Sequence, residues 1–219
     1  MIRLHYAPSS ASMIPHILLE EIGVAYERVL VNTGEQANRD PAYLRLNPNG
    51  HVPVLTDTDS DTVLYETAAI ALYLCDAHPH SALAPVLGTT ERAQFYKWMM
   101  WLTNTLQAAL IIYFYAHRWM DAGNDAGVAE LKRNAEERID SMLSQLDAEV
   151  ARTGGPWFMG AEYTALDAYA FTLCRWTRNF DRTTPARDRS FLGPYLLRML
   201  ARTSVQRVLA NEGLSSPYI

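Results

Sequence analysis

The sequence predicts an α+β protein with two differently built parts: a first part in which strands alternate with helices, and a second part made of helices alone. Short strand-like runs and helical patterns alternate up to about residue 80, whereas from about residue 90 the chain holds long helical patterns and no convincing strand. The first part is also acidic, while the remainder is close to neutral. A change of pattern and charge at the same place favours separate domains.

The first part predicts the element order β-α-β-α-β-β-α. Its elements are expected at residues 2–6, 12–22, 25–31, 40–46, 54–56, 62–65 and 66–77. Gly23 ends the first helix. Asp40 and Pro41 open the second helix, because a capping side chain followed by proline is typical of a helix start. The polar turn between the last two strand-like runs indicates a hairpin.

The second part predicts at least three long helices, at residues 90–119, 128–152 and 166–178. Glycine and proline separate these helices, as is typical of loops. Glycine and proline also cluster between the two parts of the chain. We therefore expect a first domain at residues 1–80, a linker at 81–89 and an all-helical domain at 90–219.

The composition is that of an ordinary globular protein, with 49% hydrophobic and 20% charged residues. A net charge of −5 argues against a nucleic-acid-binding protein, because phosphate groups are neutralised by a basic surface. No apolar run is long enough to span a bilayer and the first residues lack a signal-peptide pattern, so we expect a cytoplasmic protein that binds no membrane. His78 and His80 lack further ligands at suitable spacing, so no metal site is expected.

Three serines, Ser9, Ser10 and Ser12, lie in the loop between the first strand and the first helix. Ligands of open α/β sheets bind at the carboxyl ends of strands, and the N-terminus of a helix stabilises an anion. A serine held there could donate a hydrogen bond to a thiolate and so lower the pKa of a bound thiol. Alternatively, Ser12 caps the helix while Ser9 and Ser10 form a turn.

Two further segments of the first part have both a structural and a functional interpretation. Val52-Pro53 opens a strand, either as an ordinary edge or, with a cis bond, as a backbone that pairs with an extended peptide. Glu66-Thr67 opens a helix, either as a simple cap or as a site for an ammonium group and a carboxylate.

Together, in this order and spacing, the three segments resemble the glutathione site of the glutathione transferase superfamily. The opening YAPSSASMIPHILLEEIGVAYE is similar to that of bacterial beta-class members, and NPNGHVPVL resembles the NPxGxVPxL segment of the family. The resemblance extends over essentially the whole chain. It implies a thioredoxin-like first domain, glutathione as co-substrate and a homodimer. It also implies a glutathione-binding set made of His51, Val52, Pro53, Glu66 and Thr67.

The helical part agrees with the resemblance and also departs from it. Thr164 and Asp167 match the capping box of the family, a structural feature at the start of a core helix. Ala11 stands where beta-class members carry a cysteine, and Ser9 aligns with the thiol-activating serine of theta- and zeta-like members. Ser9 is therefore the catalytic candidate, with Ser10 and Ser12 as alternatives. Met100 and Gln107 replace an asparagine and a histidine of the beta class, which puts membership in that class in doubt.

The function expected from this resemblance is transfer of glutathione to an electrophilic small molecule bound by the helical domain. Three alternatives remain open: glutathione-dependent reduction of a disulfide or peroxide, isomerisation through a transient adduct, and a non-catalytic binding protein of the same fold.

The helix at 90–119 is rich in aromatic residues, most of them expected in the core or at a dimer surface and a minority in an apolar pocket. An arginine-rich stretch at 175–189 would favour an anionic acceptor, bridge to acidic groups, or form a solvated face.

Overall fold

The computed structural model describes residues 1–219. The chain folds into two compact units, the first made of Met1–Ala84 with Leu200–Ser215 and the second of Pro85–Met199 with Ser216–Ile219. The end of the first segment, Ala84, lies within the expected linker at 81–89. The chain returns to the first unit for its last helix, a grouping that helical periodicity alone does not reveal. None of the helices combines the length and apolar character of a membrane span.

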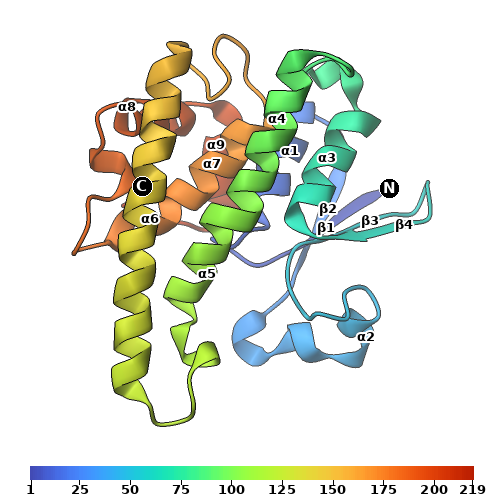
Figure 1. Cartoon of the computed structure of the whole chain (residues 1–219). Coiled ribbons are helices and arrows are strands. Elements are labelled where there is room, and N and C mark those ends of the chain that lie inside the picture. Colours follow the sequence, from blue (N-terminus) through green and yellow to red (C-terminus); the bar gives the residue numbers. More distant parts are fainter. The chain divides into compact units, whose positions relative to one another are not determined.

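A four-stranded mixed sheet forms the centre of the first unit, as Figure 1 shows. Its strands are β1 (Ile2–Tyr6), β2 (Tyr26–Leu30), β3 (Val54–Asp57) and β4 (Thr62–Tyr65), in the spatial order β2-β1-β3-β4. β1 is parallel to β2 and antiparallel to β3, and β3 pairs with β4 as the predicted hairpin. The element order predicted from the sequence is confirmed.

Four helices accompany this sheet: α1 (Met13–Ile22), α2 (Pro41–Leu44), α3 (Thr67–Ala77) and α9 (Thr203–Asn211). Figure 1 shows α1 and α3 on one side of the sheet and α2 on the other. α2 is shorter than predicted, and the N–H of Leu46 bonds to the carbonyl oxygen of Tyr43 only three residues back, which tightens the chain after the helix. Single turns of 3-10 helix occupy residues 33–35, 37–39 and 79–81.

The first helix carries the main core of this unit. All residues from Met13 to Leu19 are buried, and burial of each large apolar side chain contributes about 1.5–3 kcal/mol. Gly23 ends α1 as predicted, with a φ of 75° and its N–H bonded to the carbonyl oxygen of Leu19. A left-handed residue at this position favours glycine, which has no Cβ to clash.

The second unit contains five helices: α4 (Thr90–Trp101), α5 (Ala108–Phe114), α6 (Asp125–Thr153), α7 (Ala165–Trp176) and α8 (Leu192–Leu200). In Figure 1, α5 runs alongside α6. Short 3-10 turns occupy residues 116–119, 177–179 and 186–188.

The helix predicted at residues 90–119 is present as one helical stretch, but it contains a π-helical segment and ends earlier than predicted. A π-helical segment at Leu102–Gln107 separates α4 from α5, and α5 ends at Phe114. Within the π segment, the Thr103 hydroxyl lies 3.0 Å from the carbonyl oxygen of Met99 and 3.1 Å from the Tyr169 hydroxyl. Tyr115 then leaves the helical region of backbone conformation with a φ of −123°.

Helix α7 forms the core of the second unit, since every residue from Ala165 to Arg175 is buried. Its predicted capping box is present: the Asp167 carboxylate accepts the Thr164 N–H at 2.8 Å. The other carboxylate oxygen accepts the Phe158 N–H at 2.7 Å and the Tyr195 hydroxyl at 3.0 Å. Asp167 therefore connects the start of α7 to a preceding loop and to α8.

Candidate functional site

The three candidate segments meet at one end of the sheet. His5, near the end of β1, is paired with Val54 at the start of β3, and Val54 is paired with Tyr65 at the end of β4. The loop that follows β1, the residues that precede β3 and the residues that follow β4 therefore emerge side by side. The structure thus brings together the segments that contain Ser9, Val52-Pro53 and Glu66-Thr67.

Within the first loop, the hydroxyls of Ser10 and Ser12 make hydrogen bonds to other atoms of the same loop. The Ser12 hydroxyl is fully buried, lies 2.9 Å from the Ala7 carbonyl oxygen and accepts the Ala7 N–H at 3.2 Å. The Ser10 hydroxyl lies 2.8 Å from the same carbonyl oxygen and 2.8 Å from the Ser12 hydroxyl. The alternative in which Ser12 caps α1 is wrong, because its side chain makes no capping hydrogen bond.

Ser9 differs from its neighbours in its backbone. Its φ of 62° is in the left-handed region, which a residue with a Cβ seldom adopts. Its N–H donates to Oε2 of Glu212 at 2.8 Å. Strained backbone conformations persist only where the surroundings hold them, and here a buried carboxylate provides a partner for the strained residue.

The Glu212 carboxylate also contacts a histidine. Its Oε1 lies 2.8 Å from Nδ1 of His16 on α1, and both side chains are fully buried. The rings of Tyr6 and Tyr26 flank that imidazole, with centroids 6.0 and 5.9 Å away, and its Nε2 has no hydrogen-bond partner. One buried carboxylate thus joins the Ser9 loop to the first helix.

Sequence reasoning missed Glu212 entirely and included His16 only within the opening segment that resembles beta-class members. The one local signal for Glu212 is an acidic residue just after a helical pattern, and many surface residues share that signal. Its position is fixed by other contacts of the C-terminal segment: Arg202 pairs with Glu21 of α1 at 2.6 Å, and Arg28 donates to the Asn211 carbonyl oxygen at 2.6 Å.

The segment before β3 is held by its own side chains. The His51 carbonyl oxygen accepts the Tyr43 hydroxyl and the Asn47 amide, each at 2.8 Å. The His51 side chain is exposed, Val52 is half-buried and Pro53 is buried. The Val52–Pro53 peptide bond is cis, as the sequence suggested. The side chains of Tyr43 and Asn47 therefore fix the backbone of this segment through its His51 carbonyl oxygen.

Gly50 is required within this segment. Its φ is 63°, and a Cβ added there would lie 2.9 Å from the carbonyl oxygen of Asn38. The Asn38 amide in turn donates to the Gly50 carbonyl oxygen at 2.7 Å. Glycine permits this close approach of two backbones.

Glu66 and Thr67 form the start of α3. Glu66 is exposed and has a φ of 71°, a second strained residue at this end of the sheet. Thr67 is the first residue of the helix and is 7% exposed. The first N–H groups of a helix have no partner within it and attract negative charge. Ser9 and Glu66 are thus two non-glycine residues with a positive φ, and both lie in segments at the same end of the sheet.

In the second unit, some of the residues expected near an acceptor are buried and others are exposed. Trp98, Met99 and Tyr113 are buried, whereas Met100 is exposed. The side-chain oxygen of Gln107 accepts the hydroxyl of Tyr169 at 2.6 Å, so the π segment directs Gln107 toward α7. No group of histidine, cysteine, aspartate or glutamate side chains in the chain is arranged to hold a metal ion.

Comparison with known proteins connects this geometry to one family. The family description "Glutathione S-transferase, N-terminal domain" matches residues 8–77. Glutathione S-transferase GstB of Escherichia coli is 33% identical to this chain over 67% of it and 68% of that protein.

Solved structures agree over almost the full length. A glutathione transferase homologue from Sulfitobacter, with bound glutathione, is 27% identical with a TM-score of 0.86 and covers 98% of this chain and 99% of that one. A beta-class glutathione S-transferase from Sphingomonas chungbukensis is 31% identical with a TM-score of 0.82 and covers 97% of this chain and all of that one. The chain belongs to the glutathione S-transferase family.

Proposed function

We propose that this protein is a glutathione transferase that binds glutathione, stabilises its thiolate and transfers it to an electrophilic small molecule. The observation that carries this proposal is the meeting of the Ser9, Val52-Pro53 and Glu66-Thr67 segments at one end of the sheet. The glutathione bound to the Sulfitobacter relative supports the same ligand here.

In this proposal each segment binds one part of the tripeptide. The backbone of Val52 pairs with the cysteinyl residue, in the manner of an added strand, and Pro53 fixes the segment. Glu66 binds the ammonium group of the γ-glutamyl residue, while Thr67 and the start of α3 bind its carboxylate. The exposed side chain of His51 contributes a further polar contact at the same segment.

Ser9 is the proposed activating group. Ser9 aligns with the thiol-activating serine of theta- and zeta-like members and lies in the loop between β1 and α1, so we assign to it the hydrogen bond to a bound sulfur. A hydroxyl that donates to a thiolate favours the ionised form and lowers the thiol pKa. The contribution is electrostatic and requires no covalent intermediate with the enzyme. Ala11 at the position of the beta-class cysteine excludes a mixed disulfide there.

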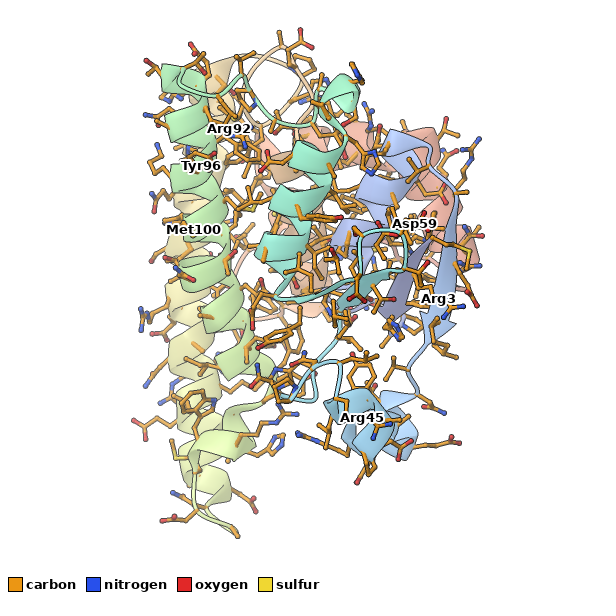
Figure 2. The ribbon with its side chains drawn as sticks, turned by 90° about the vertical axis from the view of Figure 1, so that its right-hand side faces the viewer. Arg3, Arg45, Asp59, Arg92, Tyr96 and Met100 are labelled. Atoms are coloured by element: carbon orange, nitrogen blue, oxygen red, sulfur yellow. The ribbon has the colours of Figure 1, made fainter.

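A homodimer in the cytoplasm with a role in detoxification completes the proposal. α4 provides an apolar face suited to a second copy: Tyr96 and Met100 follow Arg92 along this helix, as Figure 2 shows, and are 39% and 42% exposed. These two side chains, one helical turn apart, are the apolar groups that a second copy would cover.

The decisive experiment is calorimetry of glutathione with the full chain, followed by activity on a chloronitrobenzene and on hydroxyethyl disulfide. Glutathione binding with activity on the chloronitrobenzene is expected. Activity on the disulfide alone would instead assign a reductase. Failure to bind glutathione in a protein that is folded by circular dichroism would contradict the proposal and favour a non-catalytic protein of this fold.

A further inference from the structure

The second unit contains a pocket of its own, about 440 Å³ in volume, between α5, the start of α6 and the end of α7. This volume is within the range of sites for small organic ligands. Four of its lining residues are aromatic and two are permanent cations, which are the features that decide what it can bind. The aromatic residues are Tyr113, Phe114, Trp176 and Phe180, and the cations are Lys132 and Arg178.

The four rings form one continuous series along the pocket. Trp176 contacts Phe114 edge-to-face with centroids 6.3 Å apart, and Phe114 contacts Tyr113 in the same way at 5.2 Å. Tyr113 then packs against Phe180 at 4.5 Å. Edge-to-face contacts fix the orientations of neighbouring rings, so the wall is preorganised for a planar unsaturated ligand.

The charge of the lining is entirely positive. The Lys132 ammonium lies 4.7 Å from the centre of the Tyr113 ring, and Arg178 and His117 lie along the same pocket. No aspartate or glutamate lines it. The nearby Glu136 is buried, and its carboxylate accepts the N–H groups of Arg182 and Thr183. Asp181 is the second carboxylate near Tyr113, and no ion pair joins it or Glu136 to Lys132. Because the Arg178 guanidinium donates to the Arg175 carbonyl oxygen at 3.1 Å, Lys132 is the principal cation that the pocket offers to a ligand.

We propose that this pocket binds small aromatic carboxylates and thereby selects acceptors of that class. Aromatic rings alone would also attract a cation, but the ammonium of Lys132 is already placed over the Tyr113 ring, so a cationic ligand meets repulsion. An anion gains a charge-assisted contact with Lys132 or Arg178 while its ring packs on the aromatic wall. As a site for acceptors, the pocket rests on the transferase function proposed above.

The first test measures binding without glutathione and without chemistry. Titration of the full chain with naphthoate, followed by tryptophan fluorescence and calorimetry, is compared with titration by naphthamide, its uncharged analogue. We expect naphthoate to bind about tenfold more tightly than naphthamide, the difference that one charge-assisted hydrogen bond supplies. Added salt weakens the binding of naphthoate and leaves that of naphthamide unchanged.

Variants of two neighbouring cations on α6 test whether the preference for naphthoate depends on Lys132. Lys132→Met should remove most of the preference for naphthoate, and Lys132→Arg should restore it. Arg133→Met makes the same charge change one residue along α6, at a position outside the lining, and should leave the preference intact. Because Lys132 and Arg133 are both exposed, each variant is expected to fold, which circular dichroism checks.

The two proposals fail separately. Equal binding of naphthoate and naphthamide, or an equal loss of preference in Lys132→Met and Arg133→Met, overturns the assignment of this pocket, whatever the result with glutathione. Selective binding of naphthoate by a protein that does not bind glutathione supports the pocket as a site for aromatic carboxylates and overturns the transferase function. With both ligands bound, kcat/KM for an electrophile that carries a carboxylate should exceed that for its ester by about tenfold and fall in Lys132→Met.

Discussion

The backbone N–H of Ser9 donates to Oε2 of Glu212 at 2.8 Å, across 203 residues of sequence. The other oxygen of the same carboxylate contacts His16 on the first helix, and both side chains of that pair are fully buried. The loop with the proposed activating serine is thus held from the far end of the chain. Its geometry depends on a residue that cannot itself reach a ligand from within the core.

Glu212→Gln should loosen the Ser9 loop. The glutamine offers one oxygen and one NH₂ where two carboxylate oxygens now face Ser9 and His16. The charge-assisted contact to the Ser9 N–H is therefore lost, and a donor is left unpaired unless Nδ1 of His16 becomes an acceptor. A buried unpaired donor costs about 1–3 kcal/mol, which urea denaturation would detect as a lower free energy of unfolding. We also expect kcat/KM for a chloronitrobenzene to fall by about tenfold, because Ser9 is misplaced.

The control for this variant is Glu35→Gln, which removes a charge from an exposed residue and should change stability by less than about 0.5 kcal/mol. A purely structural role for Glu212 would lower stability while leaving unchanged the pKa of bound glutathione. An unchanged pKa in a folded Glu212→Gln protein would therefore contradict its role in positioning Ser9.

Ser9→Gly and Ser9→Ala should both raise the pKa of the bound thiol, by about 1 to 2, because a charge-assisted hydrogen bond to the thiolate is lost. The two variants differ in backbone strain. Glycine adopts the φ of 62° freely, whereas alanine keeps the strained Cβ. A rise in the thiol pKa that both variants share is therefore due to loss of the hydroxyl. The thiolate absorbance of bound glutathione across pH is the measurement. A raised pKa in Ser10→Ala with none in Ser9→Gly would transfer the role to Ser10.

Ser12→Ala should affect stability before chemistry. The buried Ser12 hydroxyl is the partner of the Ala7 N–H, which alanine would leave unpaired at a cost of about 1–3 kcal/mol. Ser10→Ala should cost less, since Ser10 is only half-buried. Thermal unfolding of the two variants, together with the thiol pKa of bound glutathione, separates these roles. A larger loss of stability in Ser10→Ala would contradict this division.

The sequence predicted the sheet and its three candidate segments well, because strand alternation, turn residues and helix caps are local signals. The Thr164 and Asp167 capping box was predictable for the same reason: its two partners are three residues apart. The π segment within the long helix was missed, since its Thr103 contacts Tyr169, which lies on another helix.

The role of Glu212 was unpredictable for a related physical reason. Its partners, Ser9 and His16, are about 200 residues away, and no periodicity or motif encodes that pairing. Similarly, Ser12 stands at the position where a serine usually caps a helix, yet its hydroxyl bonds to Ala7 instead. Long-range polar contacts of this kind are decided by tertiary packing, which a single sequence does not display.

The stability of the second unit should depend on pH through Asp167. Burial raises the pKa of this carboxyl to about 6, above its ordinary value of 3.8, although hydrogen bonds from Phe158, Thr164 and Tyr195 partly oppose the increase. The folded state therefore binds the proton more tightly than the unfolded state. The stabilising contribution of the protonated group is complete below about pH 4 and is lost as the pH rises through 6. The full change is up to about 3 kcal/mol.

Asp167→Asn isolates this contribution, because asparagine does not titrate. The variant should be less stable than the parent at every pH, since its amide nitrogen cannot accept the Thr164 or Phe158 N–H that faces it. Its deficit in unfolding free energy should be largest near pH 4.5 and smaller near pH 7.5, where the parent has lost the contribution of its proton. Urea denaturation of both proteins at the two pH values measures the deficit. A deficit that grows with rising pH would show that the hydrogen bonds to the carboxylate outweigh its burial and that the pKa of Asp167 is lowered in the folded state.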